Sequence, residues 1–214
     1  MTPRAQAALG AALSVVLLAL PLATTLLAPL EAVASVAYAW SVWLLARNHP
    51  LGWWVGLVGV SAYAVVFFEA RLFAEVGLQA VYFVTSLQAI WLWLKGGPAR
   101  TERPVSSLPA WWWAPTLLVV AATTWGLYEV LVHLRGEVPF WDALTTVLSL
   151  VAHVYLMGRF VQSWYVWIVV DTIYVPLYAS RGLYLTSALY VGFWVLALGG
   201  LLTFRRLLAE RAQA

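Results

Sequence analysis

The sequence has no cysteine and few charged residues. Without cysteine the chain can hold neither a disulfide framework nor a thiolate metal site. For the same reason, cysteine usage does not indicate whether the protein lies in an oxidising or a reducing compartment. Only 10% of its 214 residues are charged, whereas a soluble domain carries about 25% because its surface faces water. The three histidines, His49, His133 and His153, lack the spacing of metal ligands. These absences exclude a soluble globular fold, and we expect neither a metal nor a cofactor.

The sequence also lacks the motifs of several functional classes. No GxxxxGKS/T phosphate loop is present, so we do not expect this chain alone to be powered by ATP. The net charge is only +3, and the basic residues lie between the apolar runs, which suits membrane topology better than nucleic-acid binding. The apolar runs hold no nucleophile–base pair. We therefore expect neither a nucleic-acid partner nor an enzyme.

Hydrophobic residues make up 64% of the chain and fall in long runs separated by short polar breaks. A run of about 20 apolar residues crosses a bilayer as a helix. The fourteen tryptophans and ten tyrosines fit this class, because amphipathic rings settle at the headgroup level. The pattern predicts an all-α integral membrane protein in a lipid bilayer. The expected segments are 7–28, 31–46, 51–70, 76–94, 110–134, 142–158, 163–179 and 184–204.

The first segment has two interpretations. It contains Pro21 and Pro29 and follows Arg4, a combination that also suits a signal peptide. Its roughly 20 apolar residues favour an uncleaved helix.

Loop charges indicate the topology if eight segments alternate sides. One side then receives Arg71, Arg135 and Arg181, and the other receives Arg4, Arg47, Lys95, Arg100, Arg103, Arg159, Arg205, Arg206 and Arg211. The excess of basic residues identifies the second side as the cytoplasm. We therefore expect both termini inside the cell.

An internal repeat predicts the architecture. Residues 31–83 match residues 142–194 without a gap, and each polar break in one half falls opposite a break in the other. Each repeat has three helices and a single helix joins them, so the repeats point the same way. The expected fold is a 3+1+3 bundle of parallel repeats, as in SWEET transporters, plus an extra N-terminal helix, with a site near the midplane between the repeats. The expected divisions are an N-terminal helix (1–29), a first repeat (30–95), a linker with the connecting helix (96–139), a second repeat (140–206) and a cytoplasmic tail (207–214).

One helix face of segment 163–179 combines aromatic rings with a carboxylate. Its members recur at steps of three or four residues and so share one face: they are Trp164, Trp167, Asp171, Tyr174 and Tyr178. A carboxylate near the bilayer centre, as expected for Asp171, costs on the order of 3 kcal/mol on insertion scales, so it should face a cavity or a partner. It is either a polar anchor beneath an aromatic box or a structural hydrogen-bonding group, for instance toward His153. The aromatic neighbours favour the anchor.

Segment 76–94 carries a second polar face. Gln79 and Tyr82 share 3–4 spacing with Ser86, Ala89 and Trp93 and offer an amide and a hydroxyl to the bundle interior. The same groups also form interhelical hydrogen bonds, so both interpretations stay open. Gln88 lies off this face and is the remaining candidate on the segment.

The first repeat keeps the aromatic residues of the Asp171 face but not its charge. Trp53 stands at the position of Trp164, whereas Val60 replaces Asp171. A single anchor suits one asymmetric ligand better than two equal sites. A flat, aromatic and cationic molecule would stack on these rings, and a cation over an indole gains roughly 0.5–2 kcal/mol.

Over residues 30–206 the chain resembles the PnuC family of bacterial vitamin transporters. The run from Trp164 to Asp171, WYVWIVVD, looks like the family's WxxWxxxN/D motif. The stretch from Gln79 to Trp93 is similar to its QxxYxxxxxxGxxxW motif, with Ala89 in place of the usual glycine. The segments LGWWVGLVGVSAYAVVFFEARL and SRGLYLTSALYVGF also resemble this family.

The resemblance implies a multi-pass protein of the bacterial inner membrane that imports nicotinamide riboside by facilitated diffusion. Phosphorylation in the cytoplasm traps the vitamin in this family, and its members form trimers. The implied substrate contacts include Gln79, Tyr82, Trp164, Trp167 and Asp171. With the other candidates, the predicted substrate-binding set is Trp164, Trp167, Asp171, Tyr174, Gln79, Tyr82, Gln88 and Trp53.

Two alternatives stay open. Relatives in the same family carry thiamine, riboflavin or deoxynucleosides, and a midplane aspartate is compatible with either cationic vitamin. The chain could instead be a membrane substrate-binding subunit that needs an ATPase partner. A membrane enzyme is the weakest hypothesis. Affinity, gating order, proton coupling and oligomeric state do not follow from the sequence.

Overall fold

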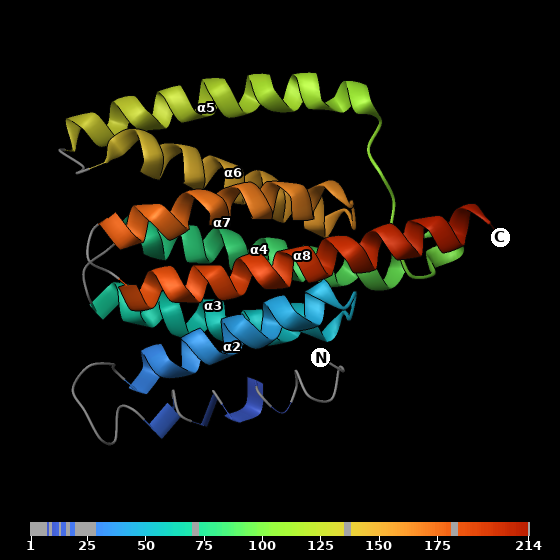
Figure 1. Ribbon diagram of the computed structural model, residues 1–214, viewed down its shortest axis with the longest axis horizontal. Helices are drawn as coiled ribbons and strands as arrows, with labels where there is room; N and C mark the ends of the chain where they lie inside the picture. The colour runs from blue at the N-terminus through green and yellow to red at the C-terminus, as the bar shows by residue number, and fades with distance from the viewer. Residues whose placement is uncertain are drawn as a thin grey trace. The chain divides into compact units, whose positions relative to one another are not determined.

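The computed structural model describes residues 8, 10–12, 14–15, 18–19, 29–69, 73–134, 138–180 and 184–213. From residue 29 onward these form seven α-helices and two short 3-10 turns, without a β-strand among them (Figure 1). The helices are α2 (Pro29–Ala46), α3 (Leu51–Glu69), α4 (Phe73–Lys95), α5 (Trp113–His133), α6 (Pro139–Met157), α7 (Gln162–Ser180) and α8 (Tyr184–Ala212). The 3-10 turns are η1 (Pro98–Arg100) and η2 (Ala110–Trp112).

The predicted all-α membrane class is confirmed, and each predicted segment from 31 to 204 corresponds to one helix. α6 starts earlier than expected, at Pro139, because proline suits the first turn of a helix, where its missing N–H has no partner to lose. α8 continues to Ala212, and an i,i+4 pair between Arg206 and Glu210 lies on this extension. The predicted segment 7–28 lies largely outside the described residues; those described within it are helical.

Six of the described helices are long and apolar enough to cross a membrane. They correspond to α2, α3, α4, α5, α6 and α8, so the protein is a multi-pass membrane protein. α7 has a similar length, 19 residues, but it carries Gln162, Ser163 and Asp171, all of them buried. A helix this polar avoids lipid by packing its polar face against other helices.

The chain divides into two compact units, residues 1–91 and 92–214. In the first, α2 packs against α3 through glycines that let the two backbones approach. A Cβ atom at Gly52 would lie 2.5 Å from Cγ of Leu45, and one at Gly59 would lie 2.7 Å from Cδ2 of Tyr38. The Ser41 hydroxyl donates to the Gly52 carbonyl at 2.8 Å across the same interface.

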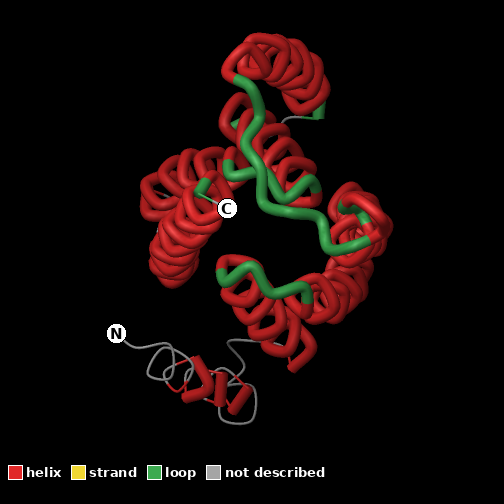
Figure 2. Tube along the Cα trace, turned by 90° about the vertical axis from the view of Figure 1, so that its right-hand side faces the viewer, coloured by secondary structure: helices red, strands yellow, loops and turns green. Residues whose placement is uncertain are grey.

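In the second unit α5, α6, α7 and α8 pack in sequence order, each against the next. The core between α6 and α7 consists of Ala152, Tyr155, Val166 and Val170. The linker before α5, drawn as a long loop in Figure 2, turns back onto the α6–α7 connection. Paired backbone hydrogen bonds join Ser106 to this connection: its N–H donates to the Arg159 carbonyl, and its carbonyl accepts from the Val161 N–H. The predicted parallel relation of the two repeats stays a prediction.

Candidate substrate-binding site

The aromatic and acidic face of α7 lies between α6 and α8. On one side, Trp167 and Tyr174 pack against the α6–α7 core. On the other side, the Trp164 ring meets Phe204 of α8, with centroids 5.6 Å apart and planes at 80°. Because both neighbouring helices contact residues of this face, it is directed into the second unit rather than toward lipid.

Asp171 lies near the middle of α7 with 4% of its surface exposed. Among the described residues, no hydrogen bond or ion pair to its carboxylate is present, including the structural bond to His153 considered from the sequence. A buried charge without a partner is costly. The geometry therefore agrees with a carboxylate directed at a ligand.

Trp164 is 2% exposed, and its indole nitrogen Nε1 has no hydrogen-bond partner among the described residues. The six-membered side of the ring lies directly over Gly200 of α8. An indole N–H is a donor only. Trp164 therefore supplies a fixed ring and one unused donor.

Beyond Asp171, toward the end of α7, three tyrosine rings lie in mutual contact. Tyr174 and Tyr178 lie 5.3 Å apart between centroids, and Tyr190 of α8 lies 4.6 Å from the first and 5.2 Å from the second. Phe193 meets the edge of Tyr190 at 5.8 Å. Tyr174 thus belongs to a self-supporting aromatic cluster as well as to the Asp171 face.

The candidates in the first unit form a separate hydrogen-bonded group. Gln79 is buried on α4, and its Oε1 accepts a hydrogen bond of 3.0 Å from the Tyr38 hydroxyl of α2. The Tyr38 ring meets the edge of Tyr63, whose hydroxyl shares a 2.8 Å hydrogen bond with Ser35. The amide nitrogen of Gln79 makes no hydrogen bond within the described part of the chain. One end of this amide is thus used for interhelical bonding, and the other end is available.

The remaining candidates differ in exposure. Tyr82 is half-buried on α4, and Trp53 is buried on α3. Gln88 is exposed and lies on the face of α4 opposite to Gln79.

Sequence reasoning missed the residues that hold the candidates in place, namely Gly200, Phe204, Tyr190 and Tyr38. A glycine pair inside an apolar helix, here Gly199 and Gly200, is a signal of close packing that could have identified the first of them. The others act through contacts between separate helices and left no pattern in the sequence.

A cluster at one end of the second unit ties the linker to the start of α7. Arg159 is 4% exposed and donates hydrogen bonds to the carbonyl oxygens of Arg103 and Trp93. Its guanidinium lies 4.5 Å from the Trp93 ring centroid and 3.4 Å from the Glu102 carboxylate. Burial lowers the pKa of Arg159 and Glu102 opposes that shift, so the guanidinium stays charged. Trp93 in turn donates from Nε1 to the Leu156 carbonyl at 3.0 Å.

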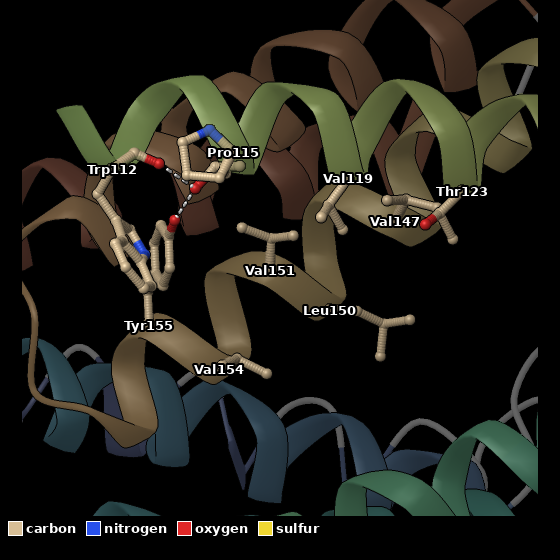
Figure 3. Close-up of a pocket in the computed structure, with 10 residues that line it drawn as sticks. Trp112, Pro115, Val119, Thr123, Val147, Leu150, Val151, Val154 and Tyr155 are labelled. Atoms are coloured by element: carbon tan, nitrogen blue, oxygen red, sulfur yellow. Dashed lines mark hydrogen bonds between the residues drawn. The ribbon is translucent and has the colours of Figure 1, made fainter.

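A cavity of about 370 Å³ lies between α5 and α6 and contains none of the predicted site residues (Figure 3). Its walls are mostly aliphatic, with Trp112 and Tyr155 at one end. Thr116 donates to the Trp112 carbonyl at 2.8 Å and shares a hydrogen bond with the Tyr155 hydroxyl. Without a free charged group this cavity does not match a polar vitamin, so α7 remains the candidate site.

Comparison with known proteins agrees with these observations. Residues 28–206 match the family model described as nicotinamide mononucleotide transporter. The nicotinamide riboside transporter PnuC of Escherichia coli is 24% identical over 197 residues, which cover 80% of this chain and 82% of the relative. The PnuC transporter of Neisseria mucosa is 33% identical over 159 residues, which cover 70% of this chain and 59% of that protein. A crystal structure of the vitamin B3 transporter PnuC superposes with a TM-score of 0.66 at 25% identity and covers 85% of this chain and 82% of the solved one.

Proposed function

The chain belongs to the nicotinamide mononucleotide transporter family, and from this membership we propose that it carries nicotinamide riboside across the membrane by facilitated diffusion. The resemblance to PnuC transporters indicated by the two sequence motifs is confirmed. The observation that carries the proposal is Asp171, a buried carboxylate on a face of aromatic rings.

The charge of the site favours the riboside over the mononucleotide. The riboside carries a cationic pyridinium ring, and a carboxylate 4 Å away attracts it by about 4 kcal/mol at an effective dielectric constant near 20. The mononucleotide adds a phosphate, which the same carboxylate repels. Phosphate sites in proteins use arginine, lysine or helix N-termini, and α7 contains no lysine or arginine.

The rings near Asp171 suit a flat cation. Trp167 and Tyr174 are half-buried, so part of each ring remains available for stacking. Trp164 is more deeply packed, and we assign it the role of a fixed wall whose Nε1 donates to a ligand oxygen. A ribose hydroxyl or the carboxamide oxygen of nicotinamide is a suitable acceptor.

Gln79, Tyr82, Trp53 and Gln88 complete the proposed substrate contacts. The amide nitrogen of Gln79, which makes no hydrogen bond among the described residues, supports its inclusion, and so does the half-buried position of Tyr82. Gln88 and Trp53 rest on the sequence pattern alone. Loss of affinity in Gln79→Ala but not in Gln88→Ala would separate these roles.

Transport of this kind needs no energy source in the chain. We propose that the vitamin equilibrates across the membrane and that a cytoplasmic kinase removes it by phosphorylation, with no catalytic activity in the transporter itself. The proposal further places the chain in the bacterial inner membrane with both termini in the cytoplasm, as a trimer like the family members it resembles.

Binding measurements on the purified protein test the substrate assignment. Isothermal titration with nicotinamide riboside, nicotinamide mononucleotide, thiamine and riboflavin should show the tightest binding for the riboside. Tighter binding of thiamine would refute the riboside as the substrate and would leave the proposal of facilitated diffusion intact. To test trapping, liposomes containing the protein should accumulate label above equilibrium only when a riboside kinase and ATP are enclosed; accumulation without them would refute passive transport.

A further inference from the structure

We infer that Gly200 on α8 is a positioning residue that fixes the Trp164 indole for binding of a flat, cationic vitamin. The inference rests on the proposed function for its consequence, but its structural part is independent of the ligand. A Cβ atom at Gly200 would lie 2.5 Å from Cδ2 and Cε2 of the Trp164 ring and 2.7 Å from Cε3. Carbon atoms in packed proteins stay about 3.5–4.0 Å apart, so only glycine permits this position of the ring.

The ring that Trp164 meets on α8, four residues beyond Gly200, is itself packed in place. Phe204 is fully buried and contacts Trp164 edge to face. Phe204 also packs against Trp93, with centroids 6.4 Å apart, and Trp93 is fixed by its hydrogen bond to Leu156. A methyl group at position 200 must therefore rotate the indole or separate α7 from α8.

Displacement of Trp164 reaches the substrate through the α7 face. Trp164 shares this face with Asp171, two helical turns along, and its unpartnered Nε1 has one fixed direction. Rotation of the ring changes that direction while the carboxylate stays in place. Gly200 thus sets the distance and angle between a hydrogen-bond donor and a charge, which together recognise a molecule with one cationic ring and several oxygen acceptors.

The chain offers a matched control in the neighbouring residue. A Cβ atom at Gly199 would meet no atom of the described residues within 4 Å. Gly199→Ala and Gly200→Ala make the same chemical change in the same helix and gain the same helix propensity. Any difference between the two variants therefore reports the contact with Trp164.

A ligand-independent experiment tests the positioning. The protein is labelled with 5-fluorotryptophan, and Trp164→Phe identifies the Trp164 resonance in the fluorine NMR spectrum of the detergent-solubilised protein. Gly200→Ala should shift this resonance, and Gly199→Ala should leave it in place. An unchanged Trp164 signal in Gly200→Ala would overturn the inference, whatever the protein transports.

A double-mutant cycle then tests the consequence for binding. Gly200→Ala should weaken nicotinamide riboside binding by about tenfold or more, as small misplacements of a binding group do, whereas Gly199→Ala should match the wild type. In a Trp164→Phe background Gly200→Ala should have little further effect, because the two changes act through one ring. Additive effects would overturn the inference.

If Gly200→Ala does not fold, it is combined with Trp164→Phe, whose smaller ring leaves room for the added methyl group. Recovery of folding in the double variant, measured by size-exclusion chromatography, would support the contact, and a double variant that still does not fold would overturn the inference. Failure of the proposed function appears differently: the wild type would then bind none of the vitamins while Gly200→Ala still shifted the Trp164 signal.

Discussion

Replacement of Arg159 should destabilise the protein strongly, although the sequence shows this residue only as one basic residue in a short break. Its guanidinium contacts the carbonyl oxygens of Arg103 and Trp93, the Trp93 ring and the Glu102 carboxylate. Its backbone adopts φ 56°, a left-handed conformation that favours glycine. We therefore consider two variants, Arg159→Ala and Arg159→Gly, which remove the same side-chain interactions and differ in backbone strain.

The magnitude follows from the interactions that the alanine variant removes. A buried carbonyl left without its donor costs about 1–3 kcal/mol, and the Arg103 carbonyl is the one most closely bound. The cation–π interaction adds about 1–2 kcal/mol. The Glu102 carboxylate is mostly exposed, so its ion pair adds about 0–1 kcal/mol. Together these contributions amount to about 2–6 kcal/mol, so Arg159→Ala should lower the free energy of unfolding by that amount, as expected for a disrupted buried network.

The glycine variant should be the more stable of the two, although glycine is ordinarily more destabilising than alanine. Alanine at a left-handed position costs about 1–2 kcal/mol relative to a right-handed one, and glycine avoids this strain. The greater entropy of glycine in the unfolded chain offsets about 0.5–1 kcal/mol of the gain. The free energy of unfolding of Arg159→Gly should therefore be about 0.5–1 kcal/mol higher than that of Arg159→Ala.

Equilibrium unfolding in mixed micelles, followed by circular dichroism, measures these differences. The matched control is Arg206→Ala, which removes an exposed arginine from an i,i+4 ion pair with Glu210 and should cost about 0.5 kcal/mol or less. The reasoning is refuted if Arg159→Ala is no less stable than Arg206→Ala. The strain component is refuted separately if alanine at position 159 is more stable than glycine.

Three further predictions concern the two units. Asp171→Asn should weaken binding of nicotinamide riboside by about tenfold to a hundredfold, since each tenfold loss corresponds to about 1.4 kcal/mol; unchanged affinity in isothermal titration would return the residue to a structural role. Trp93→Phe should lower the free energy of unfolding by about 0.5–1.5 kcal/mol, because its hydrogen bond to the Leu156 carbonyl is lost while the Arg159 N–H still donates to that carbonyl; unaltered denaturation in mixed micelles would contradict this. Gly59→Ala should destabilise the protein by about 1–3 kcal/mol, because its methyl group meets the Tyr38 ring; a thermal-unfolding midpoint equal to the wild type would show that this ring moves freely.

The helices were predictable because each break between apolar runs carries its own local signal. Proline and basic residues mark the turn before α3, and glycine and proline mark the linker after α4. The face of α7 was predictable for the same reason, since helical spacing alone brings Trp164, Asp171 and Tyr174 together.

Other features depend on contacts between residues far apart in the sequence, which no local pattern reveals. Arg159 was interpreted only as a loop charge, because its partners Trp93 and Arg103 belong to α4 and the linker. The partner of Gln79 is Tyr38 on another helix, and the role of Gly200 depends on a ring across the α7–α8 interface. Topology from loop charges gave the expected orientation, which stays a prediction.

Flux into liposomes that contain only this protein tests passive transport most directly. Labelled nicotinamide riboside is presented outside, without ATP, a kinase or an ion gradient. We predict saturable entry that stops when the inside and outside concentrations are equal, that is competed by unlabelled riboside, and that is slower in Asp171→Asn liposomes. Tight binding of the riboside without entry would contradict passive transport and would identify the chain as a binding subunit that needs a partner.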